Sequence, residues 1–114
     1  MIIIIGGSNQ GKKEFVKFNY QLSEDDILDV TNNYNIDNYR VLYHFERVVL
    51  YKKDLDMDKL KNKIIIFEDV FSSVVPVDSN LRKYREEAGH LLQILVAHAD
   101  HVIRITAGIK ETLK

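Results

Sequence analysis

The chain has 114 residues, 46% hydrophobic and 29% charged, which predicts one domain over residues 1–114 and is too apolar for a disordered protein. Its 16 basic and 17 acidic residues give a net charge of −1, and it has no cysteine, so the composition argues against a nucleic-acid binder, a disulfide framework and thiolate chemistry. No apolar run approaches the roughly 20 residues of a membrane helix; the expectation is a cytoplasmic protein that does not contact membranes.

The first half of the chain predicts a strand followed by helices. Residues 2–5 are four isoleucines, and an unbroken β-branched run is typical of a strand buried on both faces. Residues 11–19 predict a short helix. Ser23, with Asp26 three residues later, predicts another helix start. The apolar residues of the segment 37–53 recur at helical spacing and predict a helix there.

The second half predicts two more strands around a long helix. Residues 54–62 are charged and fit a short helix or a loop. Residues 64–67 form a second buried apolar run, whereas residues 70–77 have no clear period. Asp78 is a suitable N-cap for a helix that runs to about Ala99, and a strand over 102–105 is broken by Gly108. Alternating strands and helices predict an α/β fold of three layers, in which helices cover both faces of a small, mostly parallel sheet.

The segment between the first strand and the first helix fits a phosphate-binding loop. Its spacing matches the first seven positions of G-x-x-x-x-G-K-[ST]. In such a loop, backbone N–H groups and the start of the helix surround a phosphate, and the lysine reaches the β and γ phosphates. The alternative is an ordinary glycine turn. The candidate nucleotide-binding residues are Gly6, Gly7, Ser8, Asn9, Gln10, Gly11, Lys12 and Lys13.

Two further positions bear on metal binding. The eighth loop residue is Lys13, where a Ser or Thr hydroxyl would ligate Mg²⁺; an ammonium group can neutralise phosphate charge but cannot ligate a cation. Glu68 and Asp69 follow the second buried strand, at the sheet edge where ligands bind and where a carboxylate holds Mg²⁺ in phosphate-loop enzymes. They are candidate Mg²⁺ ligands, and the alternative is a pair of solvated turn acids.

An ordered series of short motifs in the C-terminal half resembles the bifunctional adenosylcobinamide kinase / adenosylcobinamide-phosphate guanylyltransferase family of cobalamin biosynthesis. The resemblance covers about residues 66–114, and the loop at Gly6–Lys12 is similar to the family's G-G-x-x-S-G-K-S. The motifs are Val74-Val75-Pro76, Lys83-Tyr84-Arg85-Glu86-Glu87-Ala88-Gly89, Gln93, Ala99-Asp100-His101-Val102, Ala107-Gly108-Ile109 and Leu113-Lys114.

The resemblance implies a phosphate-loop α/β fold, a cytoplasmic location and a homotrimer. It also implies that GTP or ATP phosphorylates the aminopropanol hydroxyl of cobinamide, and that GTP then transfers GMP through a histidine. Lys12 would act on the phosphates, and His44 is the candidate for the histidine. The chain departs from the family pattern at Lys13, at Phe71 and Ser73, and in its shorter length.

Three hypotheses therefore stay open. The first is a shortened cobinamide kinase, with or without guanylyltransferase activity, that uses Mg²⁺. The second is a relative that binds a nucleotide or a corrinoid without turnover, which Lys13, Phe71 and Ser73 favour. The third is an α/β module whose loop binds nothing. Stabilisation of the native state by nucleotide, with and without chelator, distinguishes them.

Overall fold

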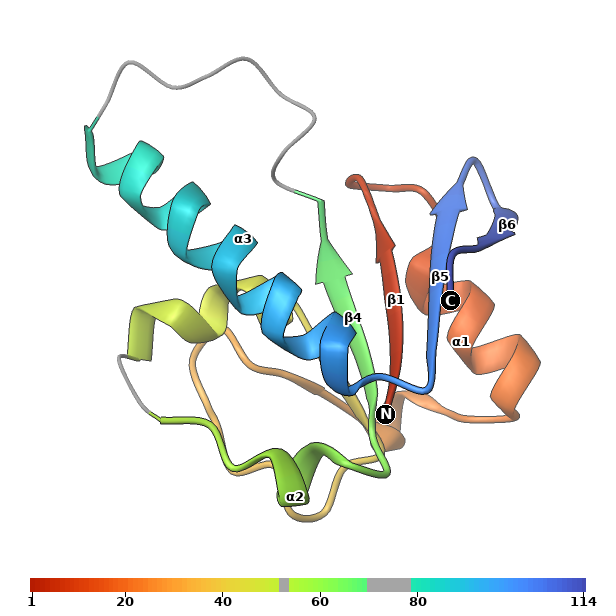
Figure 1. The fold of residues 1–114 in the computed structure, drawn as a ribbon. Helices are drawn as coiled ribbons and strands as arrows, with labels where there is room; N and C mark the ends of the chain where they lie inside the picture. The colour runs from red at the N-terminus through yellow and green to blue at the C-terminus, as the bar shows by residue number, and fades with distance from the viewer. Residues whose placement is uncertain (52–53, 70–78) are drawn as a thin grey trace.

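A six-stranded sheet forms the centre of the molecule, as a computed structural model shows (Figure 1). The structure describes residues 1–51, 54–69 and 79–114. The strand order is β2-β3-β4-β1-β5-β6. The strands are β1 (Ile2–Gly6), β2 (Ile27–Asp29), β3 (Val41–Tyr43), β4 (Ile64–Glu68), β5 (His101–Thr106) and β6 (Ile109–Thr112). The helices are α1 (Lys12–Tyr20), α2 (Met57–Leu60) and α3 (Ser79–His98), with 3₁₀ helices η1 (Glu24–Asp26) and η2 (Phe45–Tyr51).

The three strands predicted from the sequence lie side by side in the middle of this sheet. β1 runs parallel to both β4 and β5, and Ile3 pairs with Ile65 on one side and Val102 on the other. β2, β3 and β4 are also parallel, whereas β6 is antiparallel to β5. The prediction of a mostly parallel α/β sheet is confirmed.

Each face of the sheet has its own helix, because successive side chains of a strand point to opposite faces. Ile3 and Ile5 pack with Leu91 and Leu95 of α3. Ile4 packs with Val16 of α1. Figure 1 shows α1 and α3 on opposite sides of the sheet. The predicted three layers are therefore present, and each fully buried isoleucine stabilises the fold by about 1.5–3 kcal/mol.

The predicted helix over residues 37–53 is wrong. The segment forms β3 and then the 3₁₀ helix η2. Val41 and Leu42 are both fully buried because they point to opposite faces of a doubly covered strand. Phe45 and Val48 follow at the three-residue spacing of η2 and pack into the core on the α3 side. A buried strand joined to a 3₁₀ helix thus reproduces the apolar spacing of an α-helix.

Two other boundaries differ from the predictions. The helix predicted after Ser23 is a single 3₁₀ turn, in which the Ser23 backbone N–H donates to the Asp26 carboxylate at 2.9 Å. The chain then continues as β2 because Leu28 pairs with Leu42 of β3 and is buried. The second difference is β6, a strand whose residues are all exposed and which therefore shows no burial pattern.

The C-terminal ends of α3 and β5 agree with the predictions more closely. α3 runs from Ser79 to His98, whereas its predicted N-cap Asp78 and the segment 70–77 lie outside the described residues. Ala107 and Gly108 have positive φ values of 50° and 77°, as in the two-residue turns that join tight β-hairpins. Gly108 therefore turns the chain from β5 into β6.

In the described part of the chain no helix combines the length and apolarity needed to cross a membrane.

Candidate functional site

The loop between β1 and α1 lies at the carboxyl edge of the sheet, and two of its glycines are required by geometry. A Cβ atom on Gly6 would lie 2.5 Å from the carbonyl oxygen of Ile105, so only glycine allows β1 to approach β5 this closely. Gly11 is the N-cap of α1 and has a φ of 87°, in the left-handed region that glycine adopts without strain. Gly11 thus lets the loop turn into α1 without backbone strain.

Lys12 lies beneath this loop and is 5% exposed. Its Nζ donates a hydrogen bond to the Gly7 carbonyl oxygen at 2.5 Å. Burial lowers the pKa of Lys12, and the nearby carboxylates Glu68, Glu46 and Asp69 oppose that shift. The predicted phosphate-binding lysine is therefore held within the loop, at the start of α1.

Gln10 connects the loop to the β5–β6 hairpin. Its side-chain Oε1 accepts a hydrogen bond from the Ala107 N–H at 2.6 Å, and its backbone oxygen accepts one from the Gly108 N–H at 3.0 Å. Its Nε2 also donates to the Ser8 carbonyl oxygen at 3.4 Å. The sequence places Gln10 in the motif, but its contact with residues almost 100 positions away has no local sequence signal.

A pocket of about 360 Å³ opens beside the loop. Its lining combines the loop, the first turn of α1 and the end of β3, through Asn9, Gln10, Gly11, Lys12, Lys13, Glu14 and Tyr43. Lys13 Nζ lies 3.2 Å from Glu24 Oε2 and 5.1 Å from the centroid of the Tyr43 ring. Lys17 also pairs with Glu24, and hydrogen bonds from both lysines lower the pKa of Glu24.

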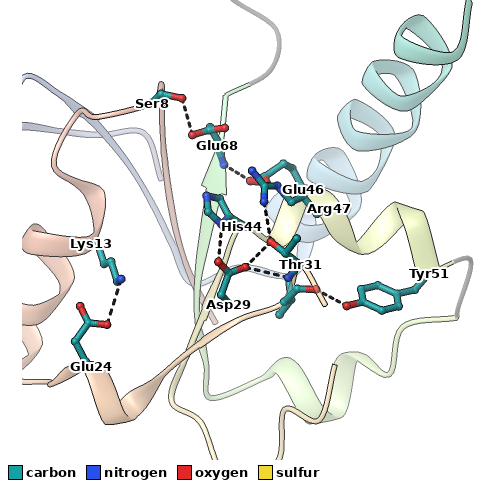
Figure 2. Close-up of polar contacts among 11 residues, drawn as sticks. Ser8, Lys13, Glu24, Asp29, Thr31, His44, Glu46, Arg47, Tyr51 and Glu68 are labelled. Atoms are coloured by element: carbon teal, nitrogen blue, oxygen red, sulfur yellow. Dashed lines mark hydrogen bonds and ion pairs between the residues drawn. The ribbon is translucent and has the colours of Figure 1, made fainter. Parts of the chain in front are cut away.

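The predicted acidic pair lies next to the loop. Glu68 ends β4 and pairs with Gly6 of β1, and its Oε1 accepts a hydrogen bond from Ser8 Oγ at 2.8 Å. Figure 2 shows these two side chains facing each other. The Asp69 backbone N–H donates to the Gly6 carbonyl oxygen at 2.8 Å. The fold therefore brings together the loop and the acids, which are about 60 residues apart in the sequence.

His44 lies farther along the same sheet edge, after β3, with a φ of 60°. Its Nδ1 is 3.1 Å from Asp29 Oδ2 (Figure 2), and its ring centroid is 3.9 Å from that of Tyr43. The Thr31 backbone N–H and hydroxyl also donate to Asp29. Burial acts to raise the pKa of Asp29, but the hydrogen bonds from Thr31 and His44 outweigh it and lower that pKa. An oriented imidazole thus adjoins Tyr43, which lines the pocket.

Glu46 is a site residue that the sequence did not indicate. It is 1% exposed, and its Oε1 accepts a hydrogen bond from the Glu68 backbone N–H at 2.8 Å. Pairing of β3 with β4 stops at Leu42 and Ile65, so this carboxylate replaces a missing strand partner. Among the described residues its Oε2 has no hydrogen-bond partner, and Arg47 Nε lies 3.7 Å away. Burial raises the pKa of Glu46.

A comparison with models of protein families identifies the family of this chain. A family model described as cobinamide kinase / cobinamide phosphate guanyltransferase matches residues 42–113. The chain belongs to this family. The matched region contains β4, α3 and the β5–β6 hairpin, and it includes His44 and Glu68. The suspected family membership is confirmed, and it extends beyond the resemblance seen over residues 66–114. A search of curated proteins found no match.

Membership in the cobinamide kinase / cobinamide phosphate guanyltransferase family relates the chain to enzymes of cobalamin biosynthesis. The candidate phosphate loop at residues 6–13 precedes the matched region. Its assignment depends on the motif spacing and on the geometry of Gly6, Gly11 and Lys12.

Proposed function

We propose that this member of the cobinamide kinase / cobinamide phosphate guanyltransferase family binds GTP or ATP through the loop at residues 6–13. The observation that carries the proposal is the pocket beside Gly11, Lys12 and Lys13 at the start of α1. Backbone N–H groups at a helix start bind anions, and lysine ammonium groups add positive charge. The pocket volume of about 360 Å³ lies within the usual range for small-molecule sites.

The proposed reaction is phosphoryl transfer to the aminopropanol hydroxyl of cobinamide. The acceptor oxygen forms a bond to the γ phosphorus, the bond between that phosphorus and the β–γ bridging oxygen breaks with GDP or ADP as the leaving group, and the proton of the acceptor hydroxyl passes to water. Catalysis of this step is mainly positioning and charge stabilisation. Lys12, held in the loop, would stabilise the negative charge on the transferred phosphoryl group.

The contact between His44 and Asp29 supports a second proposed activity, guanylyl transfer. Asp29 engages Nδ1 at 3.1 Å, which orients the imidazole so that Nε2 is the nucleophile. In this step Nε2 forms a bond to the α phosphorus of GTP, the α–β phosphoanhydride bond breaks, and pyrophosphate leaves. The Tyr43 ring, which lies 3.9 Å from the His44 ring, also lines the pocket.

Binding is tested by thermal unfolding and calorimetry with GTP, ATP and GMP. We expect GTP or ATP to raise the Tm, since a ligand at 100 times its Kd stabilises the native state by about 2.7 kcal/mol. Lys12→Met should abolish the shift. The matched control is Lys17→Met, on the same helix but outside the residues that line the pocket. Absence of stabilisation by every nucleotide would contradict the proposal.

Turnover is tested separately by incubating the protein with nucleotide and cobinamide and detecting cobinamide phosphate. Guanylyl transfer is tested by incubation with GTP labelled on the α phosphate, which should leave an acid-labile label on His44. Nucleotide binding without either product would overturn both proposed reactions and leave a binding protein.

A further inference from the structure

The position that ligates Mg²⁺ in a phosphate loop is occupied here by a lysine. The residue after the loop lysine normally supplies a hydroxyl oxygen to the metal. Lys13 stands at that position, and its ammonium group has three donors and no lone pair with which to ligate a cation. Lys13 therefore differs from the residue of a metal-dependent loop in its chemistry, because its side chain cannot ligate a cation.

The described oxygen donors near the loop do not form a ready-made cluster of metal ligands. The Ser8 hydroxyl donates to Glu68 Oε1 at 2.8 Å, so the loop hydroxyl and the nearest carboxylate are bonded to each other. Across residues 1–51, 54–69 and 79–114, no group of three histidine or acidic side chains is placed to hold a metal ion. The described residues thus lack both the hydroxyl ligand after the loop lysine and a ready-made cluster of metal ligands.

Lys13 is instead placed to act on an anion in the pocket. It lines the pocket together with Gly11 and Lys12. The Nζ atom of Lys13 lies over the Tyr43 ring, 5.1 Å from the ring centroid, and an aromatic face attracts a cation at this distance. The Lys13 side chain is 29% exposed, so it is supported by the protein and still accessible to a ligand.

The ion pair of Lys13 with Glu24 does not prevent this role. The Glu24 side chain is 61% exposed, and it also pairs with Lys17. Water screens such a surface pair, and Lys17 still neutralises Glu24 when Lys13 turns toward a polyphosphate. The Lys13 ammonium group is therefore a second positive charge next to Lys12 that can pair with a ligand.

We propose that Lys13 takes the place of Mg²⁺, so that the loop binds GTP or ATP as the metal-free polyphosphate. Lys12 and Lys13 together provide two positive charges beside the start of α1, and Lys13 acts as a point charge on the phosphate oxygens. This inference rests on the proposed nucleotide binding and specifies the form of the nucleotide that is bound.

The experiment is calorimetric titration of the full chain with GTP and with ATP, in EDTA and in excess Mg²⁺. We expect the Kd in EDTA to equal or be lower than the Kd in Mg²⁺, because Mg²⁺ neutralises the phosphate charge that the lysines bind. Lys13→Ser should weaken metal-free binding by about tenfold or more and should restore a requirement for Mg²⁺.

Two controls separate charge from folding. Lys59→Ser removes an exposed lysine of α2 that neither lines the pocket nor pairs with Glu24, and it should leave both Kd values unchanged. Lys13→Arg keeps the charge and should retain metal-free binding. Wild-type binding that requires Mg²⁺ would overturn this inference and leave the proposed nucleotide binding intact. Absence of binding in both buffers would instead contradict the proposed function itself.

Discussion

The two halves of the carboxyl edge of the sheet are built in different ways. Around β1, the side chains of Lys12 and Gln10 bond to backbone groups: Lys12 to the Gly7 carbonyl oxygen, and Gln10 to the Ala107 N–H of the β5–β6 hairpin. Around β2 and β3, side chains pair with each other, as in the contact of half-exposed Asp29 with His44. The first arrangement is fixed by the course of the chain, whereas the second can change by substitution without altering the fold. We therefore expect the loop half to respond more strongly to mutation.

The largest expected effect is that of Gly6→Ala. The added Cβ would lie 2.5 Å from the Ile105 carbonyl oxygen, so β1 and β5 must separate or distort. Overpacking of this kind destabilises a protein by about 1–3 kcal/mol, and we expect a value at the upper end with loss of nucleotide affinity. Gly7→Ala is the matched control, because its nearest atom would be 3.7 Å away. Denaturant unfolding measures both; equal effects would contradict the close-approach argument.

Glu46 links the two halves and comes next. Glu46→Ala leaves the Glu68 N–H without its acceptor, and an unsatisfied buried group reduces stability by about 1–3 kcal/mol. Glu46→Gln retains an acceptor oxygen without the charge and should lose less. Chemical denaturation of the three proteins at one pH would show this order, and a Gln variant as unstable as the Ala variant would contradict it.

The same residue gives a pH prediction. The pKa of Glu46 is raised above its ordinary value of 4.5, so the folded state holds its proton more tightly than the unfolded state. Its contribution to stability is then lost as pH rises from about 4.5 through the raised value. Unfolding free energies measured from pH 4 upward should fall more steeply in the wild type than in Glu46→Gln. The lowered pKa values of Asp29, Glu24 and Asp100 act in the opposite direction and cancel in this comparison.

A smaller effect is expected at Gln10. Gln10→Ala removes the side-chain hydrogen bonds to Ala107 and to the Ser8 carbonyl oxygen, and it leaves the backbone bond to Gly108 in place. The loss should be about 1 kcal/mol, with a several-fold weaker nucleotide affinity because the loop is less constrained. Gln93→Ala, at an exposed position of α3, is the control and should change neither quantity. A Gln10 variant with wild-type affinity would show that the hairpin does not hold the loop.

The smallest effect on stability is expected at His44. His44→Asn removes the imidazole but suits the left-handed φ of 60°, and exposed ion pairs contribute about 0–1 kcal/mol. The Tm should change little, while the label from α-labelled GTP should disappear. If His44→Asn reduced the stability as much as Gly6→Ala does, the proposed difference between the two halves would be wrong.

Buried patterns made the centre of the fold predictable, and exposed or short elements did not. Residues 2–5 and 64–67 are apolar throughout, and the 20 residues of α3 show a helical apolar pattern. β2 and β3 have three residues each, too few to show a period, and the 3₁₀ spacing of η2 extends the β3 residues into a false helix. β6 is entirely exposed.

The candidate site follows the same division. The loop motif indicated Lys12 and Lys13 because its residues are consecutive in the sequence. The role of Glu46 depends on where β3 ends relative to β4, which is a tertiary property. The contact of Gln10 with the hairpin likewise depends on the neighbouring position of β1 and β5.

The close approach at Gly6 has one more consequence, for strand alignment during folding. β1 offers four isoleucines to the three isoleucines of β4, so a slip by two residues would keep the same faces and nearly the same side chains. If β1 slips by two residues toward the carboxyl edge against both neighbours, Ile4 comes to stand where Gly6 meets the Ile105 carbonyl oxygen, and that position has no room for a side chain. Gly6 therefore disfavours this misaligned sheet. The four isoleucines of β1 cannot do so, because each of them fits the position of another.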